Sequence, residues 1–99
     1  MIDTTATVVQ TEGLLSTTVD DEMVVLNLRA GCYVTLDRVG RRIWELLASP
    51  WLVGDLIAAL ATEFDADQSV IAADLAAFLH ELERDGMVDA VTAPDVREG

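Results

Sequence analysis

The sequence predicts one α+β domain, in which a three-stranded antiparallel sheet precedes three helices and a short C-terminal strand. Three observations support this fold class. Up to Leu36, short apolar and β-branched runs are separated by turn-forming residues, which is typical of half-buried strands. From Asp37 onward the apolar residues recur at helical spacing instead. The 99 residues, 52% of them hydrophobic, are enough for one modest core without a metal or a disulfide.

The first third of the chain predicts a three-stranded antiparallel meander. Leu14 to Val19 and Met23 to Leu28 are apolar or β-branched, and the acidic cluster Asp20-Asp21-Glu22 between them favours a turn. A second turn, Arg29-Ala30-Gly31, contains a glycine that accepts a positive φ. The chain then returns as a third strand, Cys32 to Leu36.

The run Ala6 to Gln10 precedes this meander, and it fits either a further strand or a loose N-terminal arm. We therefore expect an arm or extra strand over residues 1–13, a folded domain over residues 14–91 and a polar tail over residues 92–99. No internal repeat and no long linker divides the sequence.

The first helix is expected to begin after Asp37, whose carboxylate suits an N-cap. Val39, Ile43, Leu46 and Leu47 then share one face. The helix should end near Ala48, because proline in the pair Ser49-Pro50 lacks an N–H and disfavours helix in the residue before it.

Two further helices and a strand complete the expected fold. The second helix covers about Val53 to Phe64. The third and longest begins with Ser69 as its N-cap and ends near Asp85, where Gly86 suits a left-handed C-terminal cap. Met87 to Val91 is expected to form a last short strand or wing.

This order of elements resembles a winged helix, a shape often used to bind DNA, but the charge argues against that use. Eighteen carboxylates oppose six arginines and no lysine, which gives a net charge of −12. A protein that binds nucleic acid needs a basic face to neutralise phosphates. We therefore expect no nucleic-acid partner and interpret the acidity as a source of solubility.

The sequence also argues against a membrane or secreted protein. No apolar run approaches the roughly 18 residues of a membrane-spanning helix. The N-terminus has acidic and hydroxyl residues where a signal peptide would have a basic segment and an apolar block. The single cysteine, Cys32, excludes an internal disulfide. We expect a cytoplasmic protein with no membrane partner.

Cys32 and His80, each the only residue of its type, are the one pair that suggests a nucleophile and its base. An activated thiol needs an orienting group and an electropositive setting, so in this acidic chain we predict structural roles and no enzyme. One cysteine and one histidine without zinc-type spacing predict no metal site, and isolated glycines predict no phosphate-binding loop or other cofactor site. Ser69 stands where an acidic carrier protein could have its attachment serine, but a helix cap is the favoured interpretation.

The tryptophans and clustered arginines favour structural roles. Trp44 lies on the apolar stripe of the first helix and is expected in the core. Trp51 follows Pro50 and is expected in a loop, where it is partly exposed. Arg38, Arg41 and Arg42 carry half of the positive charge on one helix turn. We expect them to pair with the protein's own carboxylates more readily than with an acidic partner.

The third strand is the strongest candidate for a binding surface. If the sheet has sequential order, Cys32 to Leu36 lies at its edge with unpaired N–H and C=O groups. The segment contains no charge and no proline. An edge of this kind beside an amphipathic helix suits a guest peptide that adds as an extra strand. Masking by the N-terminal segment or by a dimer partner fits the same edge equally well.

The ordered segments resemble the PqqD-like family of leader-peptide recognition proteins, the recognition elements of ribosomally synthesised and post-translationally modified peptides (RiPPs). The resemblance covers about Leu14 to Val91. A separate chain of this size is similar to the PqqD-like proteins of lasso peptide clusters and of other ribosomal peptide pathways. It is carried by an ordered series of apolar, small and acidic residues: Leu26-Asn27, Gly31-Cys32-Tyr33, Leu36, Gly40, Ile43-Trp44, Asp74, Phe78-Leu79, Leu82 and Gly86-Met87-Val88.

The resemblance implies a non-catalytic adaptor, or peptide chaperone. Such a protein binds the leader segment of a precursor peptide by β-strand addition and presents it to a modifying enzyme or leader peptidase. Its implied peptide-binding residues here are Cys32, Tyr33, Val34, Thr35 and Leu36 of the third strand and Val70, Asp74, Ala77, Phe78 and Glu81 of the third helix. The alternative from a different class is an acidic winged-helix-like structural or regulatory module that dimerises through its edge strand.

Overall fold

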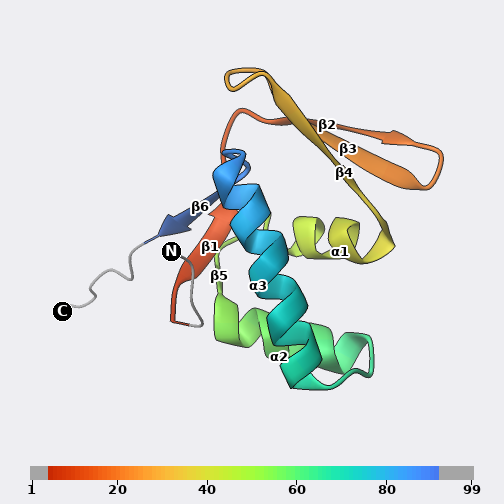
Figure 1. Cartoon of the computed structure of the whole chain (residues 1–99), viewed down its shortest axis with the longest axis vertical. Helices are drawn as coiled ribbons and strands as arrows, with labels where there is room; N and C mark the ends of the chain where they lie inside the picture. Colours follow the sequence, from red (N-terminus) through yellow and green to blue (C-terminus); the bar gives the residue numbers. More distant parts are fainter. Residues whose placement is uncertain (1–4, 92–99) are drawn as a thin grey trace.

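The computed structural model of the protein describes residues 5–91, which form two small sheets around three helices (Figure 1). The expected meander, the three helices and the terminal strand are confirmed. The expected tail, residues 92–99, and residues 1–4 of the expected arm lie outside the described residues. The elements are β1 (Thr7–Gln10), β2 (Leu15–Val19), β3 (Glu22–Asn27), β4 (Cys32–Leu36), α1 (Arg38–Leu46), β5 (Trp51–Leu52), α2 (Val53–Glu63), α3 (Gln68–Arg84) and β6 (Val88–Val91).

The meander is a sheet of order β2-β3-β4 with antiparallel pairing throughout. Its turns need two positive φ angles, 56° at Asp20 and 73° at Gly31, and both residues suit that region. Val25 at the centre is fully buried and pairs with Ser16 on one side and Val34 on the other. All five residues of β2 are exposed, so this sheet contributes to the core through β3 and β4 only.

A second sheet, of order β5-β1-β6, was not predicted. The segment that fitted either a strand or an arm contains β1, which pairs with β6 on one side and with the two-residue β5 on the other. Trp51, expected in a loop, lies in β5 and is half-buried. Val8 of β1 is completely buried, and the Gln10 N–H donates to the Leu47 carbonyl at 2.9 Å. This strand therefore joins the end of α1 to the start of α2.

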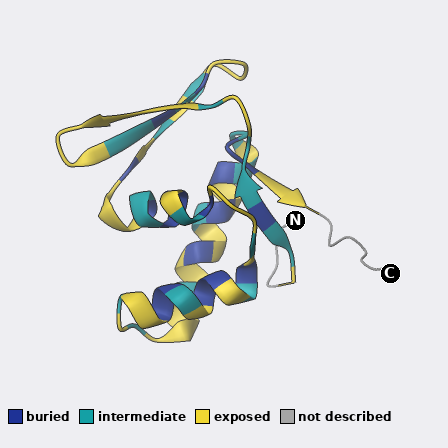
Figure 2. Cartoon of the chain, turned by 180° about the vertical axis from the view of Figure 1, so that it is seen from behind, coloured by how far each residue is buried: buried dark blue, intermediate teal, exposed yellow. Residues whose placement is uncertain are grey.

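The core lies where the three helices and the inner faces of both sheets meet. Figure 2 shows the buried positions of α2 and α3 on the sides that face the rest of the molecule. Trp44 is 5% exposed, which confirms its expected core position. The largest fully buried side chains are Leu36, Leu47, Leu56, Leu60, Leu75, Leu79, Leu82 and Met87 with Val8 and Val25.

The helix caps follow the sequence with one correction. The Asp37 carboxylate accepts a hydrogen bond from the Gly40 N–H at 2.8 Å, as predicted. The prediction that Ser69 caps α3 is wrong, because the helix begins at Gln68 and Ser69 already lies in its first turn. The cap is Asp67, which accepts from both the N–H and the hydroxyl of Ser69. These two hydrogen bonds lower the pKa of the Asp67 carboxyl.

Two of the three arginines of α1, Arg41 and Arg42, pair with the protein's own carboxylates, and no ion pair is seen for Arg38 among residues 5–91. Arg41 Nε lies 3.3 Å from Glu45 Oε2, one helix turn away, and Arg42 Nε lies 2.8 Å from Glu63 Oε2 at the end of α2. The hydrogen bond from Arg42 to Glu63 raises the pKa of the Arg42 guanidinium. Both pairs are exposed, so they contribute modestly to stability. Only the pair of Arg42 with Glu63 joins α1 to α2.

Candidate functional site

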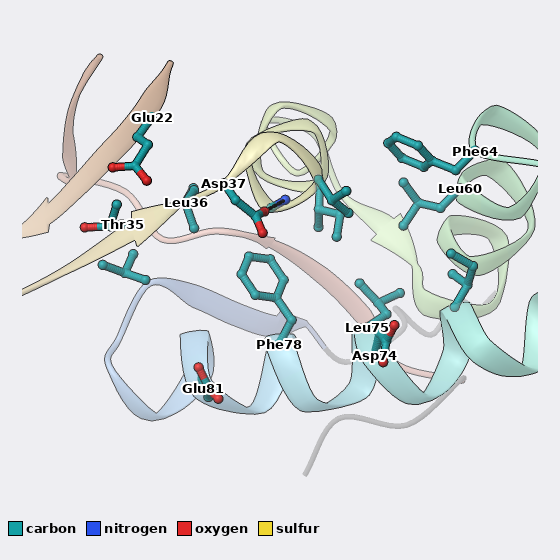
Figure 3. A pocket seen from close by; sticks show the side chains of 15 residues that line it. Glu22, Thr35, Leu36, Asp37, Leu60, Phe64, Asp74, Leu75, Phe78 and Glu81 are labelled. Carbon is teal, nitrogen blue, oxygen red and sulfur yellow. Dashed lines mark hydrogen bonds between the residues drawn. The ribbon is translucent and has the colours of Figure 1, made fainter. Parts of the chain in front are cut away.

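A groove of about 550 Å³ lies between the sheet β2-β3-β4 and helix α3. Figure 3 shows the end of β4 and the start of α1 on one side of it, α3 on the opposite side, and α2 at one end. Its lining residues are Glu22, Val34, Thr35, Leu36, Asp37, Val39, Gly40, Ile43, Leu60, Phe64, Ile71, Asp74, Leu75, Phe78 and Glu81.

Strand β4 forms the first wall and is an edge strand. Among the described residues it pairs with β3 alone, so its other edge has no strand beside it. Alternate side chains of β4 point inward, and Leu36 is buried while Tyr33 is 67% exposed. The part of the N-terminal segment that the structure describes does not pair with this edge, because its strand β1 belongs to the other sheet.

Helix α3 forms the second wall through one stripe of side chains. Asp74, Phe78 and Glu81 follow one another at helical spacing and line the groove, beside the apolar Ile71 and Leu75. Phe78 points across the groove towards Leu36 and Asp37 (Figure 3).

The groove brings together only part of the residue set expected from the sequence. Its lining includes Val34, Thr35, Leu36, Asp74, Phe78 and Glu81. Cys32, Tyr33, Val70 and Ala77 do not line it. On α3, Val70 and Ala77 lie further round the helix than Asp74 and Glu81, and both are exposed.

A cluster of hydrogen bonds closes the groove where β4 begins and α3 ends. The Asn27 side-chain amide donates to the carbonyls of Asp85 and Gly86 at 3.1 and 3.2 Å, and its oxygen accepts from the Ala30 N–H at 3.1 Å. The Cys32 thiol donates to the Asp85 carbonyl at 3.4 Å. Cys32 therefore contacts the end of α3 directly, which explains why its side chain does not line the groove.

Gly40 sets the distance between α1 and α3. A Cβ atom at position 40 would lie 3.4 Å from Phe78 Cζ and 3.3 Å from Asp37 Oδ1. Glycine therefore lets the Phe78 ring approach the backbone of α1 while Asp37 caps the same helix turn. Sequence reasoning missed this role, because a glycine inside a helix gives no sign of what packs against it.

The floor of the groove contains residues that the sequence assigned to the core or did not single out. Val39, expected on the apolar stripe of α1, is 45% exposed at the groove. Leu60 of α2 and Phe64, the residue that caps the C-terminus of this helix, also contribute to the lining. Nothing in the sequence indicated that these two residues reach the same groove as β4. Their helical periodicity predicted an inward face, but periodicity does not say which partner that face meets.

The chemical groups in and around the groove suit non-covalent binding. Cys32 and His80, for which structural roles were predicted, have separate environments, since the Cys32 thiol donates to the Asp85 carbonyl and His80 is exposed on α3. In the part of the chain that the structure describes, no cluster of three His, Cys, Asp or Glu side chains could hold a metal ion. What the groove presents is an open strand edge, an apolar floor and several carboxylates.

Within residues 5–91, no helix combines the length and the apolarity needed to cross a bilayer.

An antiparallel three-stranded sheet whose last strand faces the third helix across a groove defines the class of RiPP recognition elements. The chain belongs to the PqqD family, since the family model described as "Coenzyme PQQ synthesis protein D (PqqD)" matches residues 22–88. The matched segment contains both walls of the groove but not β1 or β2.

A solved structure with a bound peptide is similar to this chain. It is described as "TbiB1 in Complex with the TbiA(beta) Leader Peptide". The likeness has a TM-score of 0.69 at 30% sequence identity and covers 86% of this chain and 99% of the TbiB1 chain. Among curated proteins, none matches this sequence.

Proposed function

We propose that the protein binds the leader segment of a ribosomally made precursor peptide in RiPP biosynthesis, without catalysis of its own. The observation that carries this proposal is the unpaired edge of β4 beside a groove with an apolar floor. An extended leader would pair its main chain with β4 and place alternate side chains in the groove against α3.

The PqqD family and the TbiB1 complex support this function. TbiB1 is bound to a leader peptide, and the match to this chain covers 99% of the TbiB1 chain. By analogy, we propose that the bound leader is presented to a modifying enzyme or leader peptidase in the cytoplasm. A lasso peptide pathway is the favoured context.

A nuclear magnetic resonance titration tests the proposal. The probe is the synthetic leader of the precursor whose gene neighbours that of this protein. We expect the amide signals of Cys32 to Leu36 and of α3 to shift, because the guest strand would donate to and accept from β4. Absence of shifts in both elements would contradict leader binding.

The alternative is a structural or regulatory module that dimerises through β4, since a second copy would satisfy the same unpaired edge. Light scattering separates the two functions. We expect a monomer that forms a one-to-one complex with the leader, whereas a tight dimer that ignores the leader would support the alternative.

A further inference from the structure

We propose that the groove selects a leader in which a lysine or arginine stands two residues from an apolar anchor. This inference rests on the proposed leader-binding function and concerns the chemistry of the guest. Its first support is the charge of the lining. Glu22, Asp37, Asp74 and Glu81 all line the groove, whereas none of the lining residues is an arginine, lysine or histidine.

Most of this negative charge has no cationic partner among residues 5–91. Asp37 already accepts from the Gly40 N–H, but in residues 5–91 no ion pair joins Glu22, Asp74 or Glu81 to a cation. The ion-paired arginines contact other carboxylates. Arg41 and Arg42 pair with Glu45 and Glu63, and Arg84 pairs with Asp85. The groove therefore keeps its negative charge available to a guest.

The carboxylates flank an apolar surface at a spacing that an extended peptide matches. On α3, Asp74 and Glu81 stand about 6 and about 4.5 Å along the helix axis from Phe78, given a rise of about 1.5 Å per residue. In a strand, side chains two residues apart point the same way and lie about 6.8 Å apart. An apolar guest side chain over Phe78 therefore brings a side chain two positions away close to Asp74 or Glu81.

A lysine or arginine fits that second position better than any other side chain. Its aliphatic stem can lie on the apolar floor beside Leu75 while its charged end reaches the carboxylate. An acidic guest residue would be repelled there, and a neutral one would leave the carboxylate unpaired. The net charge of −12 also attracts a basic leader from a distance and increases its rate of association.

The test compares two charge-matched double variants of the 99-residue chain. Asp74→Asn with Glu81→Gln removes the two carboxylates of α3 that line the groove. Glu83→Gln with Asp89→Asn removes two carboxylates that do not line it, and the new amide at position 89 retains an oxygen that can accept from Thr11. Each protein is titrated by calorimetry with the synthetic leader and with a leader whose basic residue is replaced by glutamine. Thermal unfolding checks that all variants fold.

We expect the groove variant to bind the leader about three- to tenfold more weakly than the wild type, as the loss of exposed charge pairs implies, and the control to stay within about twofold. On the wild type, the glutamine leader should bind more weakly than the natural leader by the same factor. On the groove variant, the two leaders should bind with equal affinity. Raising NaCl from about 0.1 to about 1 M, which shortens the screening length from about 10 to about 3 Å, should weaken the binding of the wild type more than that of the groove variant.

The inference is overturned if the groove variant binds as tightly as the wild type, if the control loses as much affinity, or if the leader has no basic residue two positions from an apolar one. In each of these outcomes the leader still binds, so the proposed function stands. Failure of the leader to bind any form of the protein would instead contradict the function itself.

Discussion

At the scale of single residues, Asn27 determines the geometry of the groove although it lies outside the lining. It is the one polar side chain that is buried in the described residues. Its amide satisfies two carbonyls at the end of α3 and its oxygen accepts from the turn that leads into β4. A Cβ atom on Gly86, whose φ is +72°, would lie 2.8 Å from Asn27 Nδ2, so glycine is required at that position.

We expect Asn27→Ala to lower the free energy of unfolding by about 2 to 4 kcal/mol, since three hydrogen bonds are lost and buried carbonyls are left unsatisfied. Asn27→Asp should be at least as damaging near neutral pH, because a carboxylate cannot donate to the carbonyls of Asp85 and Gly86. Urea denaturation measures both variants. Stability of Asn27→Asp close to that of the wild type would refute this role.

At the scale of elements, the edge strand β4 and the turn that precedes it present backbone groups to the groove at a fixed position. In an antiparallel ladder, consecutive residues of an edge strand direct their N–H and C=O groups alternately to the neighbouring strand and to the free edge. Val34 and Thr35 are consecutive in β4 and pair with Val25 and Val24 of β3. One of these two N–H groups therefore serves β3, and the other is free for a guest.

Proline at Val34 and proline at Thr35 should consequently behave differently. The variant that loses a hydrogen bond to β3 should be less stable. Its thermal midpoint should fall by about 4 to 8 °C for each kcal/mol by which the free energy of unfolding decreases. The variant that loses an outward N–H should fold normally but no longer bind the leader.

Circular dichroism melting and calorimetric titration separate these two outcomes. Thr35→Val, which removes the hydroxyl and keeps the N–H, is the control and should bind. If both proline variants bind the leader as the wild type does, the guest does not pair with β4.

The sequence predicted the elements whose signals are local, and the structure supplied their partners. Asp37 and Gly86 were identified as caps because each stands next to a change of periodicity. The cap of α3 was assigned to the wrong residue, because Asp67 and Ser69 are both good caps and lie only two positions apart. β5 was missed because two residues give no periodicity, and its partner β1 lies more than 40 positions earlier.

The residues that line the groove also divide into those with a local signal in the sequence and those whose position depends on how the helices pack. Asp74, Phe78 and Glu81 could be predicted from the helical stripe of α3, but the contributions of Leu60 and Phe64 depend on how α2 packs against α3. Rotation of a helix by a fraction of a turn also decides whether Ile71 or Val70 faces the groove, and periodicity alone does not define that rotation.

At the scale of the whole molecule, β1 connects parts of the chain that are distant in sequence. It pairs with β5 and β6, and the Gln10 side chain donates to the Trp44 carbonyl at 2.7 Å near the end of α1. The match to the PqqD family begins at residue 22, so this strand lies outside it. The fold of the protein therefore depends on a segment outside the residues that match the family model.

We expect Val8→Asp to unfold the protein or to lower its free energy of unfolding by about 3 kcal/mol or more, because an unpaired carboxylate would replace a completely buried side chain. The neighbouring Val9→Asp is the control, since Val9 is half-buried and points to the other face of the strand. Thermal unfolding compares the two. Equal melting of Val8→Asp and the wild type would mean that β1 is dispensable.

The closed end of the groove limits how much of a guest the protein would cover. The lining of β4 starts at Val34, because Cys32 already contacts the end of α3. A guest strand would thus be enclosed over only about three residues, or about 10 Å, opposite Val34 to Leu36. Its remaining length would stay accessible to proteases and to a second protein. The footprint on a leader would therefore be short, and most of the contacts that a longer guest makes would lie outside the groove.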